Sequence, residues 1–305
     1  MHNPVLYHQI ISCLNPQSGM RFVDCTVGSG GHAWGLLDAS KPDGLLLGLD
    51  VDPYAIEIAQ RNLAEFGDRA TLVQASYATL SKQLEDITWP DVDGILLDLG
   101  VSSMQLDNPE RGFSFQKDAP LDMRFSPGQS MTAYQLVNEL AENELANVIY
   151  WYGDERYARK IAHAIVEARP IETTGQLASL ILQVIRIKRK GIHPATRTFQ
   201  ALRIEVNQEL KNLEDTLPQA VKALKPNGKL AVIAFHSLED RIVKEYFRRE
   251  SRDCICPSKQ PVCTCGHKAS IEIITRRPIF PDDREISLNP RSRSARLRVA
   301  QKTHK

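Results

Sequence analysis

The chain has 305 residues, of which 42% are hydrophobic and 25% are charged, so it can bury a full core and form more than one structural unit. It contains no run of eighteen apolar residues, and its first ten residues lack the order of a signal peptide, so we expect a cytoplasmic protein with no membrane segment. The net charge is only +1, but residues 276–305 carry nine Lys or Arg against three acids, which predicts a local site for a polyanion.

A glycine-rich loop follows the first expected strand, at 21–23. Gly28, Gly30 and Gly31 would let the backbone approach a ligand closely, and a helix is expected directly after them. The next strand, "LLLGLD", ends in Asp50, in the position of an acid that binds ribose hydroxyls. This order predicts a nucleotide-binding turn, and a purely structural tight turn is the alternative.

The charge beside this loop indicates what kind of ligand it binds. Asp24 directly precedes the glycines, where a carboxylate would repel a pyrophosphate but attract a cation. A zwitterionic amino acid joined to a sulfonium would suit it, whereas a nicotinamide dinucleotide would not.

Two further strands predict the edge at which the site lies. "ATLVQASY" has Tyr77 near its end, and "VDGILLDLG" ends at Asp98. Strands that alternate with helices form a parallel sheet, which binds ligands outside the carboxyl ends of its strands. The residues expected at that edge are Asp24, Gly28 to His32, Asp50, Tyr77 and Asp98.

A long insertion is expected before the fifth strand, "GKLAVIAF". About 130 residues separate it from the fourth strand, and their apolar positions recur at helical spacing. We therefore expect an inserted helical subdomain at 107–198, which recognises substrate, within a sheet domain formed by 1–106 and 199–305. The long apolar pattern that begins at "RTFQALRIEVNQELKNL" would return the chain to the sheet, and "IEIIT" and "ARLRVA" would be its last strands.

Several long motifs together resemble one known family. "HNPVL", "DCTVGSGGH", "DLGVSSMQLD", "RGFSF", "PLDMR", "HPATRTFQALRIEVNQEL", "FHSLEDR" and "NPRSRSARLR" are similar to the motif series of the bacterial 16S ribosomal RNA cytosine N4-methyltransferase family. The resemblance spans nearly the whole chain and implies an α/β fold, a Rossmann-like class I methyltransferase sheet with an inserted all-helical subdomain. The chain reads "GHA" and "GDER" where the family commonly has GHS and GEER.

The resemblance also implies the reaction and its partners. It implies transfer of a methyl group from S-adenosyl-L-methionine to one cytidine in the decoding region of 16S rRNA, within the small ribosomal subunit. We expect no membrane partner, and the sequence leaves open whether two copies form a homodimer. The cofactor contacts that the resemblance implies are Gly30, Gly31, His32, Asp50, Tyr77 (often Phe in the family), Asp98 and Gln105.

Methyl transfer to an exocyclic amine needs positioning and a proton acceptor more than covalent chemistry. Asp98 is the first choice for the acceptor, and Asp122 and His236 are further catalytic candidates. For His236 the alternative is a structural role beside a helix capped by Ser237. Attack by a ring carbon would need a cysteine nucleophile at the substrate, and no cysteine is suitably placed in the sequence.

The stretch "RGFSFQKDAPLDMRF" is a candidate substrate loop. Phe113 and Phe115 could stack on an unpaired base while Arg111 and Arg124 hold phosphates. The alternative is an ordinary loop whose phenylalanines fill a core.

Two basic segments are candidate phosphate contacts. "IRIKRKGIHPATR" has five basic residues and no acid and includes Arg197, and "NPRSRSARLR" supplies Arg293 and Arg296. A solvated charged face is the alternative for each segment.

Cys254, Cys256, Cys263 and Cys265 form a compact cluster in a chain without a disulfide framework. We expect no metal here, because Cys-x-Cys pairs are less typical of zinc sites than Cys-x-x-Cys, and favour a reduced surface loop. A structural zinc is the alternative.

Other functions fit parts of the sequence. One alternative is a methyltransferase of another RNA base, a protein or a small molecule. Another is a non-catalytic RNA-binding ribosome assembly factor with a nucleotide-binding fold, against which the intact glycine loop, Asp50 and Asp98 weigh. A nicotinamide dehydrogenase is third, and Asp24 weighs against it.

Overall fold

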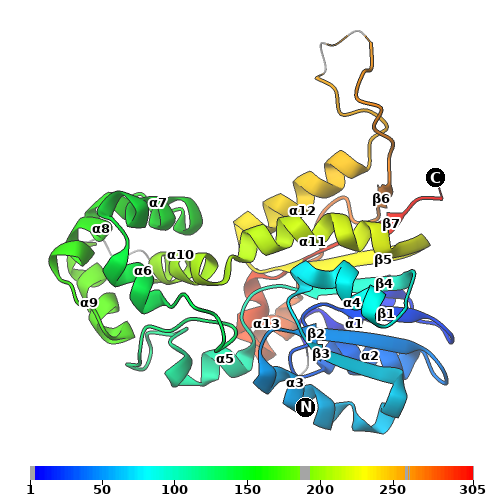
Figure 1. Cartoon of the computed structure of the whole chain (residues 1–305), viewed down its shortest axis with the longest axis horizontal. Helices are drawn as coiled ribbons and strands as arrows, with labels where there is room; N and C mark the ends of the chain where they lie inside the picture. The colour runs from blue at the N-terminus through cyan, green and yellow to red at the C-terminus, as the bar shows by residue number, and fades with distance from the viewer. Residues whose placement is uncertain (1–3, 186–192, 258–259, 261, 305) are drawn as a thin grey trace. The chain divides into compact units, whose positions relative to one another are not determined.

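The computed structural model describes residues 4–185, 193–257, 260 and 262–304. These residues form two compact units (Figure 1). The sheet unit comprises Met1–Gly100 and Leu210–Lys305, and the helical unit comprises Val101–Glu209.

The sheet unit is built on seven strands in the order β3-β2-β1-β4-β5-β7-β6. The first five of that order are parallel, whereas β7 runs antiparallel to both of its neighbours. The strands are β1 (Arg21–Asp24), β2 (Leu45–Asp50), β3 (Ala70–Gln74), β4 (Val92–Asp98), β5 (Leu224–Ala234), β6 (Ile271–Ile273) and β7 (Arg296–Lys302).

Helices cover both faces of this sheet (Figure 1). The helices of this unit are α1 (Tyr7–Leu14), α2 (Gly31–Ala39), α3 (Pro53–Asn62), α4 (Leu80–Asp86), α11 (Glu209–Ala223), α12 (Ser237–Glu250) and α13 (Asp283–Leu288), with short turns η1 (Ala64–Arg69), η2 (Tyr77–Thr79) and η4 (Pro290–Ser294). Alternate strand residues face opposite sides: Val23 packs with α4, α11 and α12, whereas Phe22 packs with α1, α2 and α3. The expected α/β fold is confirmed, and the sheet is parallel over β3, β2, β1, β4 and β5.

The helical unit has its own apolar core, as the helical spacing of its sequence predicts. Thr173 caps α9 by accepting a hydrogen bond from Gln176 N (3.3 Å). The helices are α5 (Ser103–Asp107), α6 (Ala133–Glu139), α7 (Glu142–Gly153), α8 (Ala158–Glu167), α9 (Thr174–Val184) and α10 (Thr196–Asn207), with the short turn η3 (Pro109–Arg111). None of the helices among the described residues is long and apolar enough to cross a membrane.

The long apolar pattern that begins at Arg197 forms two helices, α10 and α11. The chain breaks at Gln208, which adopts a left-handed conformation (φ 50°) between α10 and α11. Phe199 and Leu202 of α10 pack in the core of the helical unit, whereas Leu213 of α11 packs on the sheet. The units therefore divide at 100/101 and 209/210, and not at the expected 106/107 and 198/199.

Gly153 lets α7 pack closely against α10 inside the helical unit. A Cβ atom at this glycine would lie 2.7 Å from the carbonyl oxygen of Arg197 and 3.4 Å from Cβ of Ala201. Backbone at that distance cannot move aside as a flexible side chain would, so any side chain here must separate the two helices.

We expect Gly153→Ala to lower the stability of the helical unit by about 1–3 kcal/mol, because overpacking forces the helices apart. Amide hydrogen exchange in α7 and α10 measures this. Gly128→Ala is the control, since only Ser126 Oγ lies near its added Cβ, at 3.8 Å. Exchange as slow in Gly153→Ala as in the control would contradict the packing argument.

Candidate functional site

Three acidic side chains lie at one edge of the sheet. Asp24 ends β1, Asp50 ends β2 and Asp98 ends β4, and these three strands are adjacent and parallel. Their carboxyl ends therefore place the three carboxyl groups together, at the edge where such sheets bind ligands.

The loop after β1 makes hydrogen bonds to all three acidic residues, to the carboxyl groups of Asp24 and Asp50 and to the backbone of Asp98. Thr26 donates its N–H to Asp24 Oδ1 (3.2 Å), and its hydroxyl accepts a hydrogen bond from Asp98 N (2.7 Å). Gly28 N donates to Asp50 Oδ2 (3.0 Å). Thr26 thus joins two acidic strand ends, a role that the sequence analysis missed because a loop threonine has no distinguishing pattern.

The three glycines of the loop have different roles. Gly30 has a φ of 86° and caps α2, and a Cβ on Gly31 would lie only 2.5 Å from Pro4 Cγ. Local conformation and packing therefore explain these two. Gly28 has a φ of 53° and open surroundings, with only Thr26 O within 4 Å of an added Cβ, so it leaves the most room for a ligand.

The surroundings of the acidic groups at this edge disfavour the ionised form of each carboxyl. The pKa of Asp24 is raised to about 7, because burial and the charge of Asp50 together outweigh the hydrogen bonds from Thr26 that lower it. Burial also raises the pKa of Asp50 to about 6. For Asp98, burial and then the charges of Asp24 and Glu239 raise the pKa well above its ordinary value. A cation bound here would favour the ionised form of each carboxyl.

His32 is buried and neutral near pH 7, because burial lowers its pKa to about 4. Its Nε2 lies 2.9 Å from Val5 O, which can only accept, so we assign the proton to Nε2. Its Nδ1 then presents a lone pair 3.6 Å from Asp98 Oδ2, too far for a hydrogen bond. Tyr7 stacks on the ring with centroids 6.4 Å apart.

One oxygen of Asp98 has no partner among the described residues. Its side chain is 23% exposed, but Oδ1 itself is buried and accepts no hydrogen bond. A buried, unsatisfied carboxyl oxygen is costly, and a cationic or hydrogen-bonding ligand would remove that cost. The carboxyl oxygens at this edge therefore fit a ligand that carries positive charge.

Two expected cofactor residues belong to different units of the fold. Tyr77 starts η2, three residues beyond the end of β3, and packs partly buried in the sheet unit. Gln105 belongs to the helical unit, where its Oε1 accepts from Ser102 N (3.0 Å) and caps α5. Asn62, which was not expected, donates to Ser29 O in the glycine loop (2.9 Å).

The structure gives His236 a capping role. His236, and not Ser237, is the N-cap of α12, and its Nδ1 accepts from Glu239 N (3.4 Å). Its Nε2 lies 3.2 Å from Glu239 Oε1 but makes no hydrogen bond. With Nδ1 used by the cap, His236 loses support as the proton acceptor.

Asp122 and Arg124 bind each other, contrary to the roles expected for them. Arg124 Nε and Nη2 donate to the two oxygens of Asp122 at 2.9 and 2.8 Å, and Nη1 donates to Pro127 O and Gln129 O. Partial burial raises the pKa of Asp122, but hydrogen bonds from Arg124 outweigh it and keep the pKa below its ordinary value. A carboxylate so engaged is a poor base.

The aromatic candidates also turn inward. Phe113 is buried in the core of the helical unit beside Phe125 (centroids 5.7 Å apart), and Phe115 packs between His193 and Phe199. Arg111 Nη2 donates to two backbone carbonyls, of Arg124 (2.9 Å) and of Phe125. The structure favours the packing alternative for the phenylalanines. Arg111 stabilises the backbone at Arg124 and Phe125.

The basic candidates differ in how free they are. Arg293 in η4 is exposed, whereas Arg296 shares Asp240 with Arg298 (3.4 and 2.6 Å). Arg197 donates to Asp154 O. The basic run at 186–190 lies outside the described residues.

Comparison with known proteins places the chain in a family context. A sequence profile described as the MraW methylase family matches residues 1–303. "Ribosomal RNA small subunit methyltransferase H" of Dehalococcoides mccartyi is 51% identical over 99% of this chain and 86% of its own length. Proteins of the same name from Syntrophus aciditrophicus and Heliobacterium modesticaldum are 51% and 48% identical, over 99% of this chain and 97% and 98% of theirs. A solved rRNA methylase from Streptococcus thermophilus is 10% identical with a TM-score of 0.45, over 100% of this chain and 99% of that one.

We expect Asp24→Asn to stabilise the protein at pH 8. In the unfolded chain the ordinary pKa is 3.8, against about 7 when folded, so the free energy of unfolding falls as pH rises between these values. Asparagine keeps the hydrogen bond without the charge, and we expect a gain on the order of 2 kcal/mol at pH 8 and none near pH 4.

Urea unfolding at the two pH values measures this difference. Asp68→Asn, at an exposed carboxylate, is the control. A variant no more stable than the control at pH 8 would show that the fold does not disfavour the ionised form of Asp24.

Proposed function

The chain belongs to the MraW methylase family and is an S-adenosylmethionine-dependent methyltransferase; we propose that it methylates N4 of one cytidine in the decoding region of 16S ribosomal RNA. The proposed substrate is this RNA within the small ribosomal subunit, and the proposed location is therefore the cytoplasm.

The row of three carboxyl groups at one sheet edge, buried at Asp24 and partly buried at Asp50 and Asp98, is the observation that supports this proposal. S-adenosylmethionine supplies an activated methyl group on a sulfonium and carries an α-ammonium group. Asp24 and the unsatisfied Oδ1 of Asp98 suit those positive charges. In this proposal Asp50 accepts from ribose hydroxyls and Tyr77 stacks on adenine.

Asp98 is the proposed proton acceptor. The amine lone pair forms the new C–N bond, the S–C bond breaks with its electrons going to sulfur, and a proton must leave the amine. Burial raises the pKa of this carboxyl, so once a bound cation has favoured its ionised form the carboxylate takes that proton more readily than an ordinary one. Asp122 and His236 are already engaged by Arg124 and by the α12 cap, which leaves Asp98 as the best supported of the three.

The cysteines near the sheet favour attack by nitrogen over attack by ring carbon. Carbon methylation needs a thiolate nucleophile at the substrate. Burial raises the pKa of Cys25 well above its ordinary value, and burial also raises that of Cys13. Both groups are therefore thiols near neutral pH, and neither suits that role.

We expect Asp98→Asn to lower the rate of methyl transfer at saturating cofactor by about 100-fold or more, because it removes the proton acceptor without changing the side-chain size. The assay uses labelled S-adenosylmethionine and small ribosomal subunits from cells that lack this protein. Asp86→Asn, at an exposed carboxylate in α4, should retain the full rate. A near-normal rate for Asp98→Asn would remove Asp98 from the mechanism.

Mass spectrometry of nucleosides from the same reaction tests the acceptor atom. Label on N4-methylcytidine is the expected result. Label on another nucleoside would refute the proposed base. Cofactor binding without any transfer to subunits or free 16S rRNA would favour the non-catalytic assembly factor.

We expect Arg293→Ala to weaken RNA binding and to reduce the slope of log affinity against log salt by about 1, because an exposed guanidinium is free to meet a phosphate. Arg296→Ala should have a smaller effect, since Asp240 already neutralises part of that charge. Lys222→Ala on α11 is the control, and binding titrations at several salt concentrations supply the slopes. An Arg293→Ala slope equal to that of the control would make this segment a solvated face.

A further inference from the structure

A long loop leaves the sheet unit between α12 and β6 and contains four of the six cysteines. Its base is closed by hydrogen bonds from Ser270 N to Glu250 O (2.9 Å) and from Ala269 N to Asp253 Oδ1 (3.2 Å). Figure 1 shows the loop extending beyond α12, away from the sheet. Beyond its base the loop must therefore be held by its own contacts.

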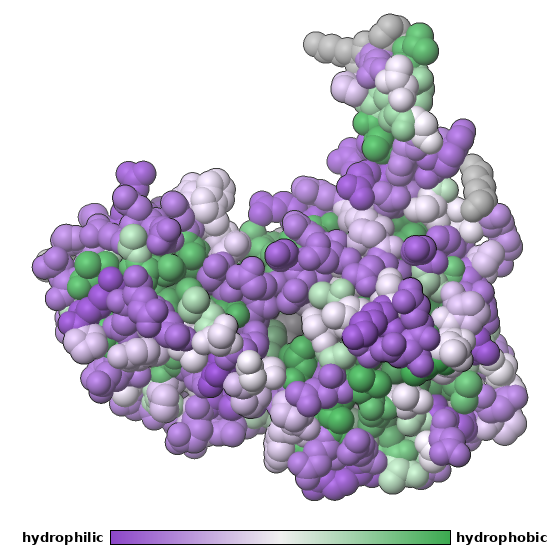
Figure 2. Space-filling model, in the orientation of Figure 1, coloured by the Kyte–Doolittle hydropathy of each residue, from purple (hydrophilic) through white to green (hydrophobic). Residues whose placement is uncertain are grey.

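The loop has no apolar core of its own among the described residues. Its two large apolar side chains, Ile255 and Val262, are 45% and 69% exposed. Figure 2 shows apolar surface on this projecting segment. A segment that cannot bury apolar surface needs a cross-link or a metal to hold one conformation.

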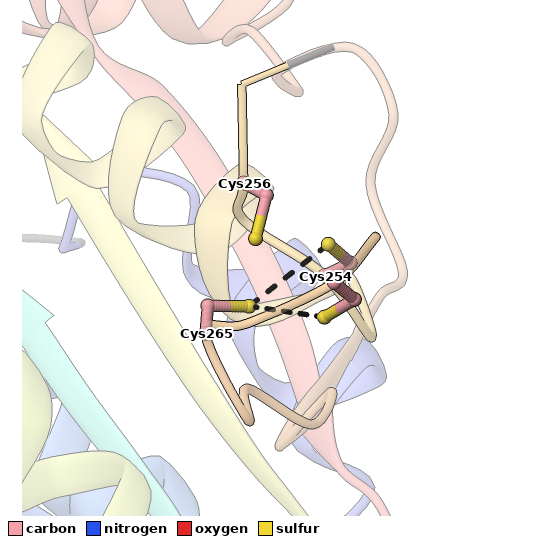
Figure 3. A group of neighbouring side chains, drawn as sticks. Cys254, Cys256 and Cys265 are labelled. Atoms are coloured by element: carbon pink, nitrogen blue, oxygen red, sulfur yellow. Dashed lines mark hydrogen bonds between the residues drawn. The ribbon is translucent and has the colours of Figure 1, made fainter. Parts of the chain in front are cut away.

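The four cysteine sulfur atoms of the loop lie close together. Every pair of the Sγ atoms of Cys254, Cys256, Cys263 and Cys265 lies within 4.8 Å. Cys265 Sγ lies 3.6 Å from that of Cys263 and 3.9 Å from that of Cys254. Figure 3 shows the side chains of Cys254, Cys256 and Cys265 pointing toward one another.

These distances fit one tetrahedral ion. Zn–S bonds of about 2.3 Å at tetrahedral angles separate neighbouring sulfurs by about 3.8 Å. Disulfide sulfurs would lie about 2.05 Å apart, and a cluster of several iron atoms would spread the thiolates farther than a single ion does.

The backbone around the sulfurs also suits thiolates. Ile255 N donates to Cys265 Sγ (3.5 Å), and a bound thiolate is a better acceptor for such a bond than a thiol. Gly266 takes a φ of 62° directly after Cys265, which lets the chain turn back without strain. His267 bonds to Arg249 O (3.2 Å), and this leaves the four sulfurs as the donor set.

We propose that Cys254, Cys256, Cys263 and Cys265 together bind one Zn²⁺ ion, which holds the loop between α12 and β6 in a fixed conformation. Binding releases the thiol protons, one from each sulfur that enters as a thiol, and involves no oxidation. All four positions are protein sulfurs, so the site is closed and structural and takes no part in methyl transfer. The spacing Cys-x-Cys disfavoured zinc in the sequence analysis, but the fold brings both pairs to one centre.

Metal content of the purified full-length protein tests the proposal. Protein prepared with reductant and without chelator should contain one zinc per chain, as measured by inductively coupled plasma mass spectrometry. The double variant Cys256→Ser with Cys263→Ser should hold less than a tenth of that, whereas Cys13→Ser, outside the cluster, should keep it. Zinc below a tenth per chain in the unaltered protein, iron in its place, or equal zinc in the double variant would overturn the proposal.

A second measurement avoids dependence on the folding of the variant. A mercurial reagent added to the unaltered protein should release one zinc to a chromogenic chelator. Limited proteolysis should then cut within 251–270, while hydrogen exchange in β1, β4 and β5 stays unchanged. Release of no zinc, or cleavage equally fast before and after release, would show that no ion holds the loop.

Discussion

The placement of three wholly or partly buried carboxyl groups at the ends of β1, β2 and β4 is the constraint on which this molecule depends. The strand order places Asp24, Asp50 and Asp98 side by side, and the charge of Asp50 raises the pKa of Asp24 while the charge of Asp24 raises that of Asp98. A fold selected only for stability would neutralise such an edge. The acidic edge is favourable when a bound ligand supplies positive charge. The three carboxyl groups therefore explain both a local instability of the unliganded fold and a preference for cationic ligands.

Much of the sheet unit could be predicted from the sequence, because its signals are local. Buried strands that alternate with helices predict a parallel sheet, and an acid at the end of a strand must lie at the ligand-binding edge. Thr26 and Asn62 could not be found in this way, because they bind backbone atoms brought near by the fold. The glycine loop was recognised, but only the structure shows that Gly31 is required for packing against Pro4.

The helical unit shows the opposite balance. Apolar spacing predicted its helices, yet the break at Gln208 has no sequence signal, since glutamine is not a typical residue for a left-handed helix end. Likewise Arg124, Phe113 and Asp122 have residue types that suit RNA or chemistry, but their partners lie within the same unit. Which side of a loop faces the core depends on tertiary contacts, and composition alone cannot determine it.

The closed base of the cysteine loop separates that segment from the rest of the fold. Ser270 N and Glu250 O already meet across its neck, so α12 and β6 would keep their places if a short turn replaced everything between them. The loop is thus a module that can be lengthened, shortened or exchanged without re-forming the sheet. Such a neck is a natural point at which to attach a label, an affinity handle or another small domain.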